Sequence, residues 1–85
     1  MKASEHKYMI PQINSAYSAL TPAEKKIADY VLENARKVIY LSVSELAEKT
    51  EVGDSTIIRF CRSIGLKGYQ EFKLMLAQEL VVPVK

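Results

Sequence analysis

The fold of this chain is decided by residues 43–63, which read VSELAEKTEVGDSTIIRFCRS. The first part predicts a short helix that places Leu46 and Ala47 inward and ends near Thr50. A tight turn follows at residues 51–53, and a second helix starts near Gly53. A short helix, a turn of about three to four residues and a second helix form the helix-turn-helix pattern.

The second helix of this pattern has one apolar face. Its apolar residues recur at three- and four-residue spacing: Ile57, Phe60, Cys61 and Ile64. The small side chain of Ala47 lets the two helices approach where they cross, and Val52 packs the turn onto the core. We therefore expect the opposite face to be free to enter a major groove, which is about 12 Å wide.

Polar and cationic residues dominate that opposite face, which carries Ser55, Thr56, Ile58, Arg59, Arg62 and Ser63. Short hydroxyls near a helix start can bond phosphates or base edges, and the planar forks of Arg59 and Arg62 match guanine or phosphate. The sequence leaves two interpretations of Ile58 open. It either contacts a thymine methyl group, or it caps the core or a dimer seam.

The turn departs from the usual pattern at two positions. Glu51 stands where glycine is frequent because the backbone tends to adopt a positive φ, and glutamate there is expected to cost about 1 kcal/mol. Gly53 stands where a serine N-cap is usual, a difference of a few tenths of a kcal/mol. These departures affect the geometry of the turn and leave the motif intact.

Helical signals also fill the chain before the motif. A first helix is predicted from one apolar stripe, Ile10, Ile13, Tyr17 and Leu20, with Pro11 in its opening turn. Thr21 and Glu24 have the spacing of a capping box, with Pro22 at the first helical position of the next helix. Asn34 is the predicted end of that helix.

Two further helix signals complete the pattern. Ser42 and Glu45 repeat the capping-box spacing at the start of the helix-turn-helix. A last helix is predicted from Tyr69, with Phe72, Met75 and Leu76 on one face and Pro83 beyond its end. Hairpin turns and sustained alternation are absent from the sequence. We predict an all-α domain of five helices over residues 1–80, with a homeodomain-like three-helix core; residues 81–85 would start a linker.

Size and composition limit the possible functions. The chain has 85 residues, which corresponds to one domain. It holds neither an apolar run long enough to cross a bilayer nor the apolar stretch of a signal peptide, so a cytoplasmic location without membrane contact is expected. The single cysteine, Cys61, excludes an internal disulfide and is interpreted as a small buried hydrophobe.

Catalytic and metal chemistry have no support in the sequence. His6 is the only histidine and stands far from Cys61, so no metal or other cofactor is expected. Glu45 and Glu48 are close in sequence without a histidine or nucleophile near them, so we predict no enzyme activity.

The charge of the chain is unevenly distributed. The formal net charge is only +2, and acidic and basic side chains balance over residues 1–51. The excess lies in residues 52–85, where Arg59, Arg62, Lys67, Lys73 and Lys85 stand against Asp54, Glu71 and Glu79. A local cationic face can bind phosphates even when the whole protein is near neutral.

Three segments resemble a known family. These are LTPAEKKIADYVLEN at residues 20–34, Arg-Phe-Cys-Arg at residues 59–62, and GLKGYQEFK at residues 65–73. Together with the helix-turn-helix between them, they resemble the N-terminal domain of the RpiR family of bacterial sugar-metabolism regulators, over about residues 8–80.

The resemblance implies a regulator, usually a repressor, that binds a palindromic operator as a homodimer or higher oligomer. It also implies a C-terminal SIS domain, outside these residues, that senses a phosphosugar effector. By the family pattern the DNA contacts fall on Ser55, Thr56, Arg59 and Arg62, with Lys67 and Gly68 near the DNA backbone.

The whole predicted DNA-binding set adds to these positions the outward face of the second helix of the helix-turn-helix and the first residues of both of its helices. It comprises Ser42, Ser44, Asp54, Ser55, Thr56, Ile58, Arg59, Arg62, Ser63, Lys67 and Gly68. The backbone amides at the Ser42–Ser44 helix start are expected to hold a phosphate. The alternative is a protein-interaction module that reuses the same fold. A docking face usually carries an aromatic or aliphatic cluster, so the polar, cationic face favours DNA.

Overall fold

The computed structural model describes residues 9–80 of the chain, so His6, Pro83 and the predicted linker at 81–85 lie outside the described residues. Within this range the chain forms five α-helices and a short 3-10 turn: α1 (Met9–Ala16), η2 (Tyr17–Ala19), α2 (Pro22–Val38), α3 (Val43–Thr50), α4 (Asp54–Ser63) and α5 (Tyr69–Leu80). The described part contains no strand, and the predicted all-α class with five helices is confirmed.

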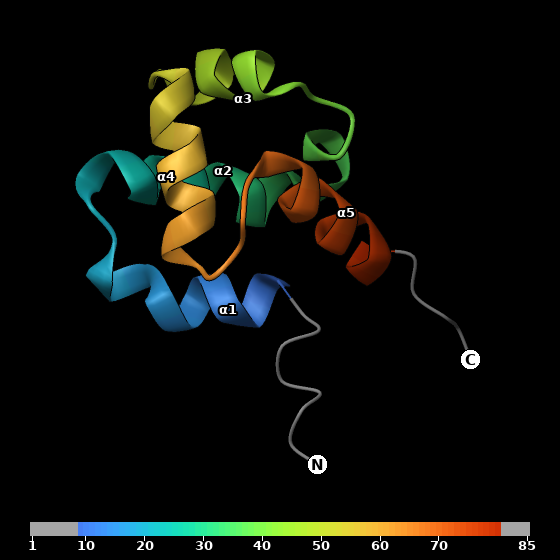
Figure 1. The fold of residues 1–85 in the computed structure, drawn as a ribbon, viewed down its shortest axis with the longest axis horizontal. Coiled ribbons are helices and arrows are strands. Elements are labelled where there is room, and N and C mark those ends of the chain that lie inside the picture. Colours follow the sequence, from blue (N-terminus) through green and yellow to red (C-terminus); the bar gives the residue numbers. More distant parts are fainter. Residues whose placement is uncertain (1–8, 81–85) are drawn as a thin grey trace.

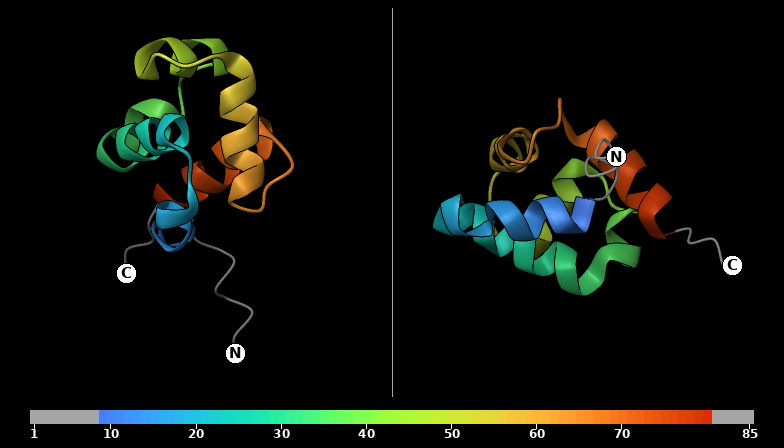
Figure 2. Two further views of the ribbon diagram at one scale, coloured as in Figure 1. Left: turned by 90° about the vertical axis from the view of Figure 1, so that its left-hand side faces the viewer. Right: turned by 90° about the horizontal axis from the view of Figure 1, so that it is seen from below.

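The helices are arranged around one core. Figure 1 shows α4 standing between α3 at its N-terminal end and α1 at its C-terminal end, with α5 to one side and α2 behind. In the side view of Figure 2, α4 lies at the outer edge of the molecule. The arrangement leaves one side of α4 facing outward along its length.

Both predicted capping boxes are confirmed. The Thr21 hydroxyl accepts from the Glu24 amide at 3.2 Å, and the Glu24 carboxylate accepts from the Thr21 amide at 3.0 Å. At the start of α3, the Ser42 hydroxyl accepts from the Glu45 amide at 3.1 Å, and the Glu45 carboxylate accepts from the Ser42 amide at 2.8 Å. These bonds satisfy amides that a helix start otherwise leaves without partners.

The predicted end of the second helix at Asn34 coincides with a break in the helical backbone, although helical structure resumes after it. Asn34 has non-helical angles, φ −131° and ψ 36°, yet the helix continues beyond this kink to Val38. The Asn34 side-chain amide donates to the Tyr30 carbonyl at 3.2 Å, which offers that carbonyl a partner at the kink. Val38 is fully buried, so packing of the last turn keeps the chain helical where the local signal favours a stop.

The core is built from the predicted apolar stripes. Buried apolar side chains come from all five helices and from the loops beside them, and Phe60 and Phe72 are the largest of those that are fully buried. The buried set is Met9, Ile13, Leu20, Ile27, Ala28, Val31, Val38, Leu46, Ala47, Ile57, Phe60, Cys61, Ile64, Leu66, Tyr69, Phe72 and Leu76. The Phe60 and Phe72 rings meet edge to face at 5.9 Å and tie α4 to α5. In the first predicted helix, Ile13 and Leu20 are buried, whereas Ile10 and Tyr17 are half-buried.

The sequence leaves open whether the turn between α3 and α4 keeps the usual geometry with glutamate at position 51, and the structure gives this position the usual positive φ. Glu51 adopts φ 61° and ψ 43°, the left-handed conformation that glycine accepts most easily. Gly53 is the N-cap of α4 and supplies no side-chain cap. Val52 is half-buried against the core and its amide donates to the Ala47 carbonyl at 3.0 Å. The turn is therefore closed by backbone bonds and by Val52 packing.

Within the residues that the structure describes, no helix combines the length and apolarity needed to cross a membrane.

Candidate nucleic-acid interface

The outward side of α4 brings four of the eleven predicted DNA-binding residues together around one hollow. Ser55, Arg59 and Arg62 are exposed, and Ile58 is half-buried against the core. These four side chains line a shallow hollow of about 350 Å³. Positions 55, 58, 59 and 62 are separated by three and four residues, so they lie on one face of the helix. Thr56 is half-buried at the edge of this α4 face.

Burial of the opposite side fixes the orientation of α4. Ile57, Phe60 and Cys61 are all fully buried, so the helix cannot rotate without exposing them. Burial raises the pKa of the Cys61 thiol to about 12, which leaves it protonated and chemically inert near neutral pH. The interpretation of Cys61 as a buried hydrophobe is confirmed.

The starts of α3 and α4 are joined by a contact that sequence reasoning missed. The Ser44 hydroxyl donates to the Asp54 carboxylate at 2.8 Å. The capping box already engages the amides of Ser42 and Glu45, so the amides left for a phosphate at the start of α3 are those of Val43 and Ser44. A phosphate bound there would lie near the carboxylates of Asp54 and Glu45, which oppose it.

Ser63 has a structural partner in place of a free hydroxyl. Its Oγ donates to the Glu24 carboxylate at 3.2 Å, across from α4 to the start of α2. Glu24 is almost fully buried and also holds the Thr21 amide, so it links the α2 cap to the last turn of α4. No local sequence signal marks this pair, because it depends on how α2 and α4 pack.

The loop after α4 places two more predicted residues beside the end of that helix. Lys67 is exposed, and its amide donates to the Glu71 carboxylate at 2.8 Å. Gly68 is half-buried, and its carbonyl accepts the Phe72 amide at the first turn of α5. The chain enters this loop through Gly65, whose φ of 91° requires glycine. The backbone of Lys67 is thus held in a short, anchored loop, and its side chain is exposed.

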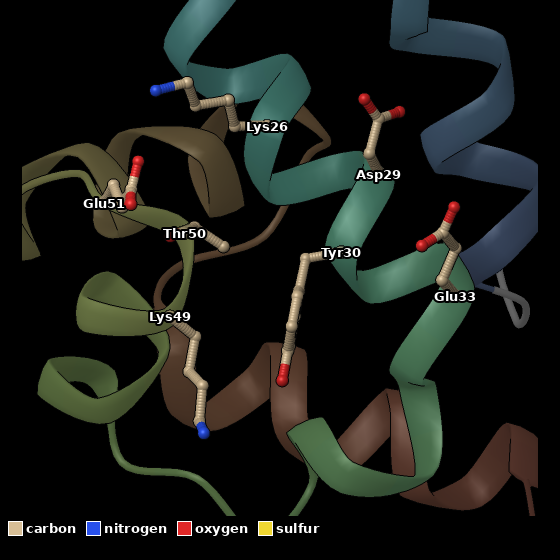
Figure 3. A pocket seen from close by; sticks show the side chains of 7 residues that line it. All are labelled: Lys26, Asp29, Tyr30, Glu33, Lys49, Thr50 and Glu51. Carbon is tan, nitrogen blue, oxygen red and sulfur yellow. The ribbon is translucent and has the colours of Figure 1, made fainter.

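A second hollow lies on another side of the molecule and has a different character. Figure 3 shows it between α2 and the end of α3, with the Tyr30 side chain lying between the two elements. Its volume is about 300 Å³, and its lining mixes both signs of charge: Lys26, Asp29, Tyr30, Glu33, Lys49, Thr50 and Glu51. The carboxylates would repel a polyanion, so the α4 face is the better phosphate-binding surface.

Within residues 9–80, no group of three or more potential metal ligands lies together.

A family model describes the same architecture. The model for the helix-turn-helix domain of the rpiR family matches residues 7–82. The chain belongs to this family. The chain is 49% identical over 72 residues to an HTH-type transcriptional regulator of Haemophilus influenzae, a match that covers 85% of this chain and 25% of the relative. The chain thus spans about a quarter of the length of that relative.

Solved structures agree with this family membership. The N-terminal domain of the transcriptional regulator ybbH from Bacillus subtilis superposes with a TM-score of 0.82 and 38% sequence identity, covering 87% of this chain and 90% of that one. The NanR protein of Vibrio vulnificus, complexed with ManNAc-6P, gives a TM-score of 0.81 and 34% identity, covering 84% of this chain and 27% of NanR. This rpiR-family chain therefore shares the fold of helix-turn-helix transcription regulators.

Proposed function

We propose that this chain binds double-stranded DNA in a sequence-specific manner, as the DNA-reading part of an rpiR-family repressor. One observation carries the proposal. The anchored helix α4 turns a face with Ser55, Arg59 and Arg62 outward, while its apolar face is locked in the core. A helix presented in this way fits the major groove, and no catalytic role is proposed for it.

The roles of the side chains follow from their positions. Ser55, Thr56 and Arg59 lie in the first two turns of α4 and are assigned to base edges. Arg62 in the last turn of α4 and Lys67 in the following loop are assigned to phosphates. At the start of α3 only the amides of Val43 and Ser44 are left for a phosphate, and the nearby carboxylates make this the weaker of the phosphate contacts. Gly68 lies beside the phosphate contact of Lys67.

The assembly and the effector are part of the proposal. Two copies would bind a palindromic operator, with half-sites about one helical turn apart. The complex of the related NanR with ManNAc-6P supports a phosphosugar effector that acts through a sensor domain outside these 85 residues. The genes controlled would serve sugar or amino-sugar metabolism, and the regulator would work in the bacterial cytoplasm on the nucleoid.

Selection from a randomised duplex library tests the proposal. The wild-type chain should enrich a two-fold symmetric site, because α4 presents side chains able to discriminate bases. Arg59→Ala should weaken binding by about 1–3 kcal/mol and relax the preference at one base pair of each half-site. Arg36→Ala is the matched control, since Arg36 is an exposed arginine in the last turn of α2. An identical binding profile for wild type and Arg59→Ala would contradict the base-reading role of Arg59.

The phosphate role of Lys67 has a different signature. Lys67→Ala should weaken binding to all sequences alike and reduce the slope of log affinity against log salt by about one. Titrations at several salt concentrations, on the selected site and on an unrelated duplex, measure both quantities. A changed base preference in this variant would show that Lys67 reads sequence and does not merely hold a phosphate.

A further inference from the structure

Ile58 is an apolar residue at the centre of an otherwise polar face. It shares the hollow on α4 with Ser55, Arg59 and Arg62. It also packs against the core, so its side chain is half-buried and only part of it reaches the hollow. A side chain that merely completed the core would not need to line a hollow together with two arginines.

The conformation of Ile58 suits a recognition surface. A β-branched side chain in a helix is held mainly in one χ1 rotamer, and packing against the core restricts it further. Little conformational entropy therefore remains to be lost when a ligand covers it. The result is a small, rigid apolar surface with a fixed position between Ser55 and Arg62.

The charges next to Ile58 indicate which kind of partner could cover the hollow on α4. A second copy of this chain, docked symmetrically on the same face, would bring Arg59 and Arg62 against their own counterparts, and that juxtaposition of like charges is unfavourable. A suitable occupant combines negative charge, for the two arginines, with a small apolar group for Ile58. Among the base-pair edges exposed in the major groove, only thymine offers an apolar group, its C5-methyl, and the phosphates supply the charge.

We propose that Ile58 is a specificity-determining residue that receives the C5-methyl group of a thymine in each half-site. The inference rests on the proposed function and deepens it, because it names the base that the centre of the α4 face selects. Arg59 then reads a base next to this thymine, and Ser55 and Arg62 flank the methyl contact from the adjoining turns of the helix.

The decisive experiment changes the DNA first. Each thymine of the selected operator is replaced in turn by uracil, which removes only the methyl group, and binding of the wild-type chain is measured. One thymine per half-site should show a loss of roughly fourfold, the value for one buried methyl group. A cytosine at that position should bind better when it is replaced by 5-methylcytosine.

A variant then links the methyl group to Ile58. In Ile58→Ala the difference between thymine and uracil at that position should disappear, whereas Ile58→Val should keep part of it because a branched apolar surface remains. Arg36→Ala, on α2, should keep the full difference. Thermal unfolding of each variant verifies that the core survives the truncation. The uracil series uses the wild-type chain, so its result does not depend on how well a variant folds.

The outcomes separate this inference from the proposed function. Tight, selective binding that is indifferent to uracil at every position would overturn the role of Ile58 and leave duplex binding standing. A methyl effect that persists unchanged in Ile58→Ala would assign the contact to another residue and also overturn it. Failure of the wild-type chain to enrich any duplex would overturn the proposed function, and the inference with it.

Discussion

At the residue scale, the backbone conformation of Glu51 agrees with its position in the helix-turn-helix. Its place in the motif predicts a positive φ, and the structure gives φ 61° there. The strain follows from the Cβ atom, which glycine lacks. The side chain contributes no hydrogen bond to the turn, since the bonds at this position come from the backbone amide of Glu51 to the carbonyls of Ala47 and Glu48. Removing the side chain should therefore relieve strain without breaking the turn.

Glu51→Gly should raise the free energy of unfolding by up to about 1 kcal/mol, because glycine adopts the left-handed conformation without strain. Urea unfolding of the variant and the wild type measures the difference. Glu48→Gly is the control, since the same change inside α3 should lower the free energy of unfolding by about 1 kcal/mol. Equal destabilisation by both changes would show that position 51 carries no strain.

Tyr69 is a residue whose surroundings no local pattern predicts. Its hydroxyl donates to the Leu41 carbonyl at 2.8 Å, and its ring stacks on Phe72. Burial, with smaller effects from Cys61 and Glu45, raises the pKa of Tyr69 to about 12, from an ordinary value of 10.0. A folded-state pKa raised above its unfolded value stabilises the fold fully below about pH 10, and this contribution is lost as the pH rises towards 12. Cys61 acts in the same direction, starting from an ordinary pKa of 9.0.

The free energy of unfolding should therefore fall as the pH rises above about 9. Tyr69→Phe should be less stable near neutral pH by about 1 kcal/mol, because the hydrogen bond to Leu41 is lost, but its stability should depend less on alkaline pH. Urea midpoints from about pH 8 to 11 measure both effects. Tyr40→Phe is the control, since Tyr40 is 80% exposed. Parallel pH profiles for Tyr69→Phe and the wild type would contradict this account.

At the scale of the helices, local signals predict starts better than ends. Both capping boxes form as the Thr21–Glu24 and Ser42–Glu45 spacings predict, because each box needs residues only three positions apart. Asn34 does interrupt α2 as predicted, but the helical backbone resumes beyond the kink as far as Val38, whose burial is a long-range effect that no local signal predicts. Helix α1 ends at Ala16 and passes into the 3-10 turn η2, although the apolar spacing continues to Leu20.

The start of α1 depends on a contact from the far end of the chain. The Glu79 carboxylate accepts from the amides of Met9 at 2.6 Å and Ile10 at 3.1 Å. A carboxylate in the last turn of α5 is unfavourable for the dipole of α5 itself, but it is favourable for the N-terminus of α1. Helix α1 also contacts α4, because the Gln12 side-chain amide donates to the carbonyl of Ile64, the C-cap residue of α4. Helix α1 thus joins the end of α5 to the end of α4.

Glu79→Gln should loosen α1 by about 0.5–1 kcal/mol, since the charge at its N-terminus is lost. Amide hydrogen exchange should show faster exchange within Met9–Ala16 and little change in α3. Glu71→Gln is the control, because Glu71 is another carboxylate of α5 and accepts from Lys67 instead of α1. If both variants exchange alike in α1, Glu79 does not hold this helix.

At the scale of the whole molecule, the sequence predicts which side of a helix is buried. It does not predict which side chains of different helices form hydrogen bonds with each other. Apolar spacing identifies the buried side of α4, and therefore also its outward side with Ser55, Arg59 and Arg62. The Ser63–Glu24 and Ser44–Asp54 bonds escape sequence reasoning because they join residues of different elements. They change two predicted contacts: the hydroxyls of Ser63 and Ser44 already have carboxylate partners before any DNA is bound.

In the proposed complex, DNA covers the outward side of α4. The most direct test is an amide chemical-shift titration of the isotope-labelled chain with its selected operator duplex. We predict that the largest changes fall on the start of α3, on residues 55–62 of α4, and on Lys67 and Gly68. Residues around the hollow between α2 and α3, such as Lys26 and Lys49, should change little. Changes centred on that second hollow or on α5, with α4 unaffected, would contradict the claim.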